Sequence, residues 1–197
     1  MITPKGRKII NGYCTDIVTD MAIDFIKESK ELGKPFMLMC QHKAPHRTWM
    51  PALRHLHLYD DITIPEPKTL FDQYEGRIPA QHQEMEIDRH MYLDHDLFTD
   101  LTPDLDFPKQ RLPSQDRSAY VNMKRMTPEQ LKTWRAAYGP KDKAFREAKL
   151  TGRDLVRWKF QRYAKNYLRA IKGVDENLAR LRKALEDQGL ADNTVFV

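Results

Sequence analysis

The sequence predicts an α/β protein in which helices flank a mostly parallel sheet. Residues 15–32 have the apolar periodicity of an amphipathic helix, and the apolar run 36–40 follows at once. Such a run, without alternation, is typical of a strand that is covered on both faces. A second run, residues 193–197, follows a long helical pattern in the same way. Strands that each follow a helix are characteristic of α/β folds.

The helix predicted over residues 15–32 has clear end signals. We expect Thr15 or Asp16 to cap its start, and Gly33, with Pro35 after it, to end it. Its apolar face is predicted to consist of Ile17, Val18, Met21, Ala22, Phe25 and Ile26.

Residues 51–150 are predicted to be a long excursion of loops and short helices, because prolines interrupt every apolar pattern in its first half. We expect an ordered cover rather than a linker, with a helical part near residues 83–91. Thr127 and Gln130 form a capping box around Pro128, which predicts a helix that ends by Gly139–Pro140.

A much longer helix is predicted over residues 151–188. Gly173 is a possible bend and Gly189 its end. We interpret its apolar and aromatic residues as core packing, not as a cofactor site. They are Leu155, Trp158, Tyr163, Tyr167, Ala170, Ile171, Val174, Leu178, Leu181 and Leu185.

The run 193–197 stops inside a predicted strand, which would leave its pairing groups half covered. We therefore expect residues 1–197 to be an internal part of a longer protein. An incomplete sheet exposes apolar surface, so we also expect a tendency to self-association.

The composition favours a globular protein with long polar loops. Charged residues make up 31% of the 197 residues, and the net charge is +5 with a pI of about 9.1. Acids and bases alternate along the helices, so we predict solvated faces and no nucleic-acid partner. No apolar stretch approaches the roughly 20 residues of a membrane span, and no signal peptide opens the chain. Cys14 and Cys40 form no CxxC pair and leave the compartment open.

The segment "QHKAPH" lies just beyond the predicted strand 36–40, where open α/β sheets bind ligands. Lys43 offers a positive charge, and His46 can hold or donate a proton near neutral pH. The pair suits an anionic ester, with Lys43 on the anion and His46 protonating the departing oxygen. The alternative is that both side chains merely cap backbone groups.

Other histidine patterns predict less. His42 and His46 are four residues apart, but Pro45 disfavours the helix that zinc ligation would need. His55 and His57 are expected at the surface. The stretch "DRHMYLDHDL" is interpreted as a hydrogen-bonded polar loop, with a metal site as the alternative. A glycine-rich phosphate loop and a GxSxG elbow are absent from the sequence.

Two longer stretches resemble the sulfatase family, the formylglycine-dependent sulfuric ester hydrolases. "GYCTDIVTDMAIDFI", "KPFML" and "KAPHRTWMP" are similar to the family's "GYxTDxxTDxAIDFI" helix, "KPFxL" strand and "KAPHxxWxP" loop. "YLRAIKGVDENLARLRKALEDQGLADNTVFV" is similar to its "YLRxVxxVDxNVGRxLDxLxxxGLxDNTVV". The likeness covers nearly the whole chain and is nearest to bacterial glycan sulfatases that act on 6-sulfated glucosamine.

The resemblance implies part of an alkaline-phosphatase-like sandwich, with residues 1–197 as an internal portion of the N-terminal catalytic domain. In that family a calcium ion and a formylglycine serve catalysis, and the substrate would be a sulfated carbohydrate. It implies that His46 contacts the sulfate and assists the leaving alcohol, and that Lys43 contacts the sulfate. Arg47 and Trp49 are weaker candidates for contacts with the sugar.

The sequence also departs from the family. Neither cysteine lies in Cys/Ser-x-Pro-x-Arg, the motif that becomes formylglycine, and "GKWHLG" and the early Asp-Asp metal pair are missing. We therefore expect no complete calcium or formylglycine site and no turnover from these residues alone. The alternatives are a phosphatase or phosphodiesterase of the same superfamily, a catalytically dead binder of sulfated glycans, and a nucleic-acid module.

Overall fold

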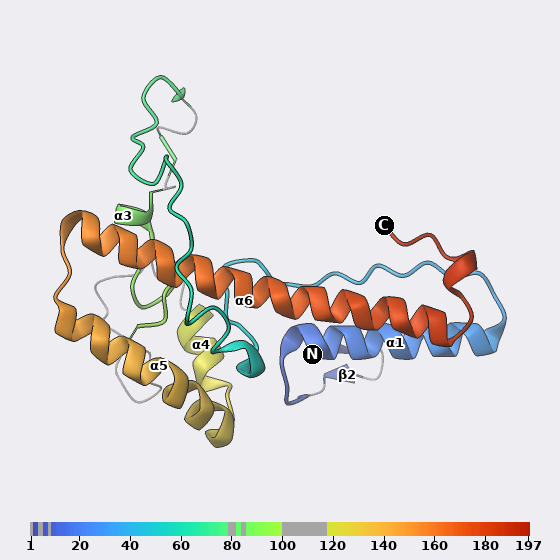
Figure 1. Ribbon diagram of the computed structural model, residues 1–197. Helices are drawn as coiled ribbons and strands as arrows, with labels where there is room; N and C mark the ends of the chain where they lie inside the picture. Colours follow the sequence, from blue (N-terminus) through green and yellow to red (C-terminus); the bar gives the residue numbers. More distant parts are fainter. Residues whose placement is uncertain (1, 4–5, 8, 79–81, 84–85, 100–117) are drawn as a thin grey trace. The chain divides into compact units, whose positions relative to one another are not determined.

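The computed structural model describes residues 2–3, 6–7, 9–78, 82–83, 86–99 and 118–197 (Figure 1). The chain forms two compact units. Unit 1 consists of Met1–His46 and Ala170–Val197, and unit 2 of Arg47–Arg169. The long helix α6, Gly152–Asp187, contributes residues to both.

Unit 1 is built from helix α1, Cys14–Leu32, packed beside the second half of α6 (Figure 1). Ala22 and Ile26 of α1 meet Leu181 and Leu185 of α6 in its apolar core. Before α1, the short strands β1, Ile2–Thr3, and β2, Gly6–Arg7, pair antiparallel. After α6 comes the 3-10 turn η2, Ala191–Asn193.

The extent of helix α1 and its C-terminal glycine are as predicted, but its N-cap residue is not. Gly33 closes it in the left-handed conformation, with φ 62°, and its N–H donates to the carbonyl of Lys30. The residue that precedes the helix is Tyr13, which makes no side-chain cap, so a cap by Thr15 or Asp16 was wrong. The predicted apolar face is also partly wrong, since Met21 and Phe25 are exposed. The buried line is Thr15, Thr19, Ala22, Ile26 and Ser29.

Polar contacts complete the α1–α6 interface. Asn177 is fully buried, and its Nδ2 donates to Asp16 Oδ1 and to the carbonyl of Gly173, both at 2.7 Å. Its Oδ1 accepts from Arg180 at 2.8 Å. Gly173 lies inside α6 where an added Cβ would sit 3.1 Å from the ring of Tyr13. The interface therefore requires a small residue at 173, for a reason other than the predicted bend.

The predicted strand 36–40 is extended but belongs to no sheet in the described part of the chain. Phe36, Leu38 and Cys40 pack on the core of unit 1, whereas Met37 and Met39 are 80% and 70% exposed. The described residues provide no neighbouring strand, so the mostly parallel sheet is not seen there, and the only described pairing is β1–β2. One side of the segment is thus packed on the core of unit 1, whereas the predicted cover of the other face is not seen among the described residues. Self-association through such a surface stays a prediction.

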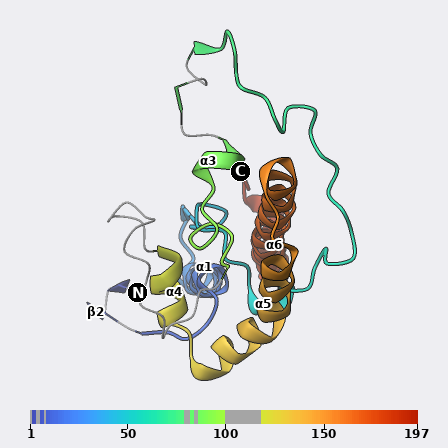
Figure 2. The same ribbon diagram turned by 90° about the vertical axis from the view of Figure 1, so that its left-hand side faces the viewer.

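Unit 2 is organised by a hairpin of α5, Pro128–Ala148, and the first half of α6, seen from its connected end in Figure 2. The capping box of Thr127 and Gln130 is confirmed. The prediction that the helix ends by Gly139–Pro140 was wrong, because α5 continues for two further turns with Pro140 inside it. The short elements η1, Leu53–His55, α3, Ile87–His90, and α4, Ser118–Lys124, complete the unit.

The apolar core of unit 2 centres on α5. Trp134 and Tyr138 stack in parallel with their ring centroids 4.3 Å apart, and Phe98 meets Trp134 edge-on at 5.6 Å. The remaining buried members are Leu56, Ala119, Met123 and Ala137. The helix near residues 83–91 is observed only as α3, and residues 79–81, 84–85 and 100–117 of the predicted cover lie outside the described residues.

The buried face of α6 in unit 2 is mostly polar, so the predicted apolar face is only partly right: its aromatic residues pack at half-buried positions. Its buried residues include Lys159, Arg162, Asn166 and Arg169. The three cations donate hydrogen bonds to backbone carbonyls that are distant in the sequence. Lys159 donates to Asp88 O at 2.6 Å, Arg162 to Leu97 O at 3.0 Å and Arg169 to Leu58 O at 2.8 Å. We call these three side chains the cationic seam. The seam satisfies carbonyls of the short helix α3, at Asp88, and of the turns at Leu58 and Leu97.

None of the described helices is both long and apolar enough to cross a membrane.

Candidate functional site

The predicted site motif spans residues 43–49, of which Lys43 and His46 are counted in unit 1 and Arg47 and Trp49 in unit 2. Lys43 and His46 belong to a turn in which the His46 N–H donates to the Lys43 carbonyl at 2.9 Å. The Ala44–Pro45 peptide inside this turn is cis. Both the lysine and the histidine side chain are exposed. The imidazole of His46 is thus outside the core, as a role on a substrate requires.

His42, in the same segment, faces the helix layer of unit 1. Its Nε2 lies 2.9 Å from Thr19 Oγ1 and 3.7 Å from Cys40 Sγ. Burial lowers the pKa of His42 and raises that of the Cys40 thiol, so both groups are neutral near pH 7. The neutral imidazole acts here as a hydrogen-bond partner that fixes the segment leading to the turn.

The lowered pKa of His42 predicts a pH-dependent stability. Below pH 6.5 the unfolded chain takes up this proton more readily than the folded one, so the free energy of unfolding falls as the pH drops through that value. Replacing His42 by glutamine keeps a hydrogen-bond partner but removes the titration. We expect the variant to lose less stability than wild type between pH 7.5 and pH 5, measured by urea unfolding with circular dichroism. An equal loss in both proteins would contradict the expectation.

Arg47 is held by a residue from the excursion. Its Nε and Nη2 donate to the two carboxylate oxygens of Asp96 at 2.5 and 2.7 Å. The guanidinium also lies over the ring of Tyr92, 5.7 Å from the centroid. The side chain of Asp96 is 1% exposed and that of Arg47 37%. Sequence reasoning placed Asp96 in a polar loop but missed its pairing with Arg47, because the two partners are 49 residues apart.

Trp49 packs against the first half of α6. Its ring centroid is 4.7 Å from that of Tyr163 and 6.3 Å from that of Tyr167, both edge-on. Such pairs contribute about 1 kcal/mol beyond their buried area. This contact fixes the second half of the motif against α6.

The histidine- and aspartate-rich stretch is a hydrogen-bonded loop, as predicted. The Tyr92 N–H donates to Asp96 Oδ2 at 2.8 Å, and the Glu86 N–H lies 3.3 Å from His90 Nδ1. His55 is buried, so the expected surface position was wrong for it, whereas His57 is exposed and bonded to Asp60.

A metal site is not formed by the described residues. Among them no three His, Cys, Asp or Glu side chains come together as a metal would require. The donors present therefore do not fit the calcium ion that the family uses, and the described residues include no formylglycine motif. The roles proposed for residues of this chain therefore involve neither calcium nor formylglycine.

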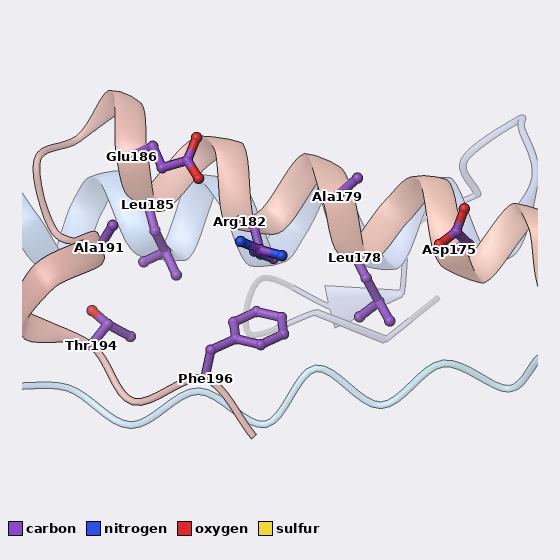
Figure 3. A pocket seen from close by; sticks show the side chains of 9 residues that line it. All are labelled: Asp175, Leu178, Ala179, Arg182, Leu185, Glu186, Ala191, Thr194 and Phe196. Carbon is purple, nitrogen blue, oxygen red and sulfur yellow. The ribbon is translucent and has the colours of Figure 1, made fainter.

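A groove in unit 1 is a separate concave surface, between α6 and the residues that follow it (Figure 3). Phe196 points back toward α6 there, near Leu178 and Arg182 (Figure 3). None of the predicted site residues lines it. Its lining residues are Asp175, Leu178, Ala179, Arg182, Leu185, Glu186, Ala191, Thr194 and Phe196.

Comparisons with known proteins identify the family of the chain. The model of the Sulfatase family matches residues 2–197. The chain is 40% identical over 193 residues to an N-acetylglucosamine-6-O-sulfatase of Bacteroides thetaiotaomicron, covering 98% of this chain and 34% of that protein. A shorter match, 30% over 84 residues, is to an arylsulfatase of Volvox carteri and covers 13% of it.

A solved structure shares the fold. It is described as a complex with its substrate D-glucosamine-2-N,6-O-disulfate, and it matches with a TM-score of 0.79 and 40% identity over 95% of this chain and 37% of that one. The chain belongs to the sulfatase family. It spans about a third of the length of the N-acetylglucosamine-6-O-sulfatase that it matches.

Proposed function

We propose that the protein containing this chain hydrolyses sulfate esters of a sulfated glycan, with 6-sulfated glucosamine as the substrate class. The observation that carries the proposal is the 40% identity over 98% of the chain to an N-acetylglucosamine-6-O-sulfatase. The likeness to a structure described with a disulfated glucosamine supports the same class.

The residues of this chain suit a supporting part in that reaction. Lys43 and His46 are exposed on a turn that Pro45 stiffens, so a lysine charge and a titratable imidazole are both accessible to an anionic ester. When the S–O bond of the ester breaks, the leaving alkoxide needs a proton, and His46 is the proposed donor. Lys43 is proposed to offset the charge of the sulfate oxygens. Arg47 and Trp49 are proposed to contact the sugar.

The chain alone is predicted to be inactive. Its 197 residues contain no Cys/Ser-x-Pro-x-Arg, so no nucleophile of the family's kind can form within them. We expect the purified chain to release no sulfate from 6-sulfated N-acetylglucosamine. The full-length protein, carrying its formylglycine, should release sulfate at a rate proportional to its concentration. Release that follows the concentration of the chain alone would refute the prediction.

Three further measurements separate the alternatives. A phosphatase or phosphodiesterase would hydrolyse phosphate esters in preference to sulfate esters. A catalytically dead binder would be retained on heparin without turnover by the full-length protein. A nucleic-acid module would bind nucleic acid with a steep dependence on salt and show little preference for sulfated sugars.

A further inference from the structure

The carboxylate of Asp96 is the most deeply buried acid that faces the proposed site motif. Its side chain is 1% exposed, and it accepts three hydrogen bonds, two from Arg47 and one from the Tyr92 N–H at 2.8 Å. A buried carboxylate is tolerated only when it is paired and hydrogen-bonded. Both oxygens are engaged, which fixes the plane of the carboxylate and, through it, the plane of the Arg47 guanidinium.

Arg47 is held but not enclosed. Its side chain is 37% exposed, although Nε and Nη2 are committed to Asp96. A bidentate contact leaves an arginine few rotamers, and a guanidinium held in one plane suits recognition of sulfate or carboxylate oxygens. Arg47 also follows His46 directly in the chain. A cation fixed in this way loses little conformational entropy when it binds an anion.

We propose that Asp96 is a positioning residue for substrate binding: it orients Arg47, which contacts an anionic group of the sulfated sugar. The inference rests on the proposed function and deepens it. The segment that carries Asp96 belongs to the excursion, so this part of the chain contributes to affinity as well as covering the fold.

Two effects of removing the Asp96 charge oppose one another. Without the carboxylate Arg47 attracts an anion more strongly, but it also loses its fixed orientation. The hydrogen-bond geometry outweighs the charge, because Arg47 is more than a third exposed and solvent weakens the gain in attraction. The proposal therefore requires that affinity falls.

The test is steady-state kinetics of the full-length protein on 6-sulfated glucosamine, with Asp96→Asn as the main variant. Asparagine keeps an oxygen for the Tyr92 N–H but loses the paired bonds to Arg47. We expect KM to rise roughly tenfold to a hundredfold, as for the loss of hydrogen bonds to a charged group, with kcat changed by less than about threefold. Arg47→Lys should raise KM in the same way, because an ammonium cannot make the fork.

A double-variant cycle shows whether Asp96 acts through Arg47. Once Arg47→Ala is present, Asp96→Asn should change kcat/KM by less than about twofold. Asp60→Asn is the matched control. Asp60 pairs instead with Arg169 at 2.6 Å and Lys141 at 2.7 Å, so the KM of this variant should equal that of wild type.

Each result decides. A KM for Asp96→Asn that is unchanged or lower, or an effect of equal size with and without Arg47, overturns the proposal. If Asp96→Asn does not fold, Arg47→Lys decides, since an unaltered KM in that folded variant overturns it as well. If wild type hydrolyses no sulfate ester, the proposed function fails and this inference with it. Wild-type turnover with unaffected variants removes the inference alone.

Discussion

Replacing His46 by alanine in the full-length protein is expected to lower kcat on 6-sulfated glucosamine by about 10²- to 10⁴-fold, the usual contribution of a general acid. The leaving group is a sugar alkoxide, which is a strong base and departs slowly without a proton. His46 is exposed on its turn, so the substitution should leave the fold intact. Initial rates of sulfate release and a thermal melt would measure both effects.

The identity of the leaving group makes this expectation sharper. An activated phenyl sulfate departs as a stable phenolate, so the His46→Ala variant should lose far less activity on it than on the sugar sulfate. His82 provides the control, because it is an exposed histidine outside the motif and His82→Ala should be as active as wild type. Equal losses on both substrates would show that His46 is not the acid, even if it still contacts the sulfate.

The largest expected loss of stability follows from replacing Arg169 by methionine. Arg169 is 1% exposed and donates to the Leu58 carbonyl, to Asn166 Oδ1 at 3.0 Å and to Asp60 at 2.6 Å. Methionine fills much of the volume but donates no hydrogen bond, so the Leu58 carbonyl loses the Arg169 donor, while Asn166 keeps its bond from Tyr138 and Asp60 its bond from Lys141. We expect the free energy of unfolding to fall by about 3 kcal/mol, because the hydrogen bonds of a buried charged group are lost.

Urea unfolding followed by tryptophan fluorescence suits this measurement, because Trp49, Trp134 and Trp158 all lie in unit 2 with Arg169. Lys132→Met removes the same charge from an exposed position on α5 and should change stability by less than about 0.5 kcal/mol. If both variants unfold at the same urea concentration, the cationic seam does not hold the loops in the way described.

Local chemistry made the helices predictable. The capping box at Thr127 and the left-handed glycine at position 33 act within a few residues of the backbone groups that they satisfy, so the sequence reveals them. The end of α5 was not predictable in this way. Pro140 is exposed, and residues on either side of it, Tyr138 and Asp142, are held by side chains of α6, which keeps α5 continuous across the proline. Tyr138 bonds to Asn166 at 2.6 Å, and Asp142 pairs with Arg162 at 2.7 Å.

The site was predictable only as far as its motif. Sequence likeness proposes Lys43 and His46 as candidates, whereas Asp96 is brought to Arg47 by a fold that no local spacing encodes. The cationic seam was missed for a related reason: apolar periodicity does not register buried cations, although Lys159, Arg162 and Arg169 recur at helical intervals of three and seven residues. The sheet was not found because a strand needs neighbours, and the described residues supply none to residues 36–40.

The cationic seam has a consequence for how this protein can diverge. The side chains of the cationic seam donate to backbone carbonyl oxygens, which every amino acid possesses. These hydrogen bonds do not use the side chains of Asp88, Leu97 or Leu58. Substitutions at those three positions would keep the hydrogen bonds to α6, provided the backbone follows the same path. Other residues of the excursion, including any that contact a substrate, can therefore change while its attachment to α6 remains the same. A change of specificity then need not lower the stability of the fold.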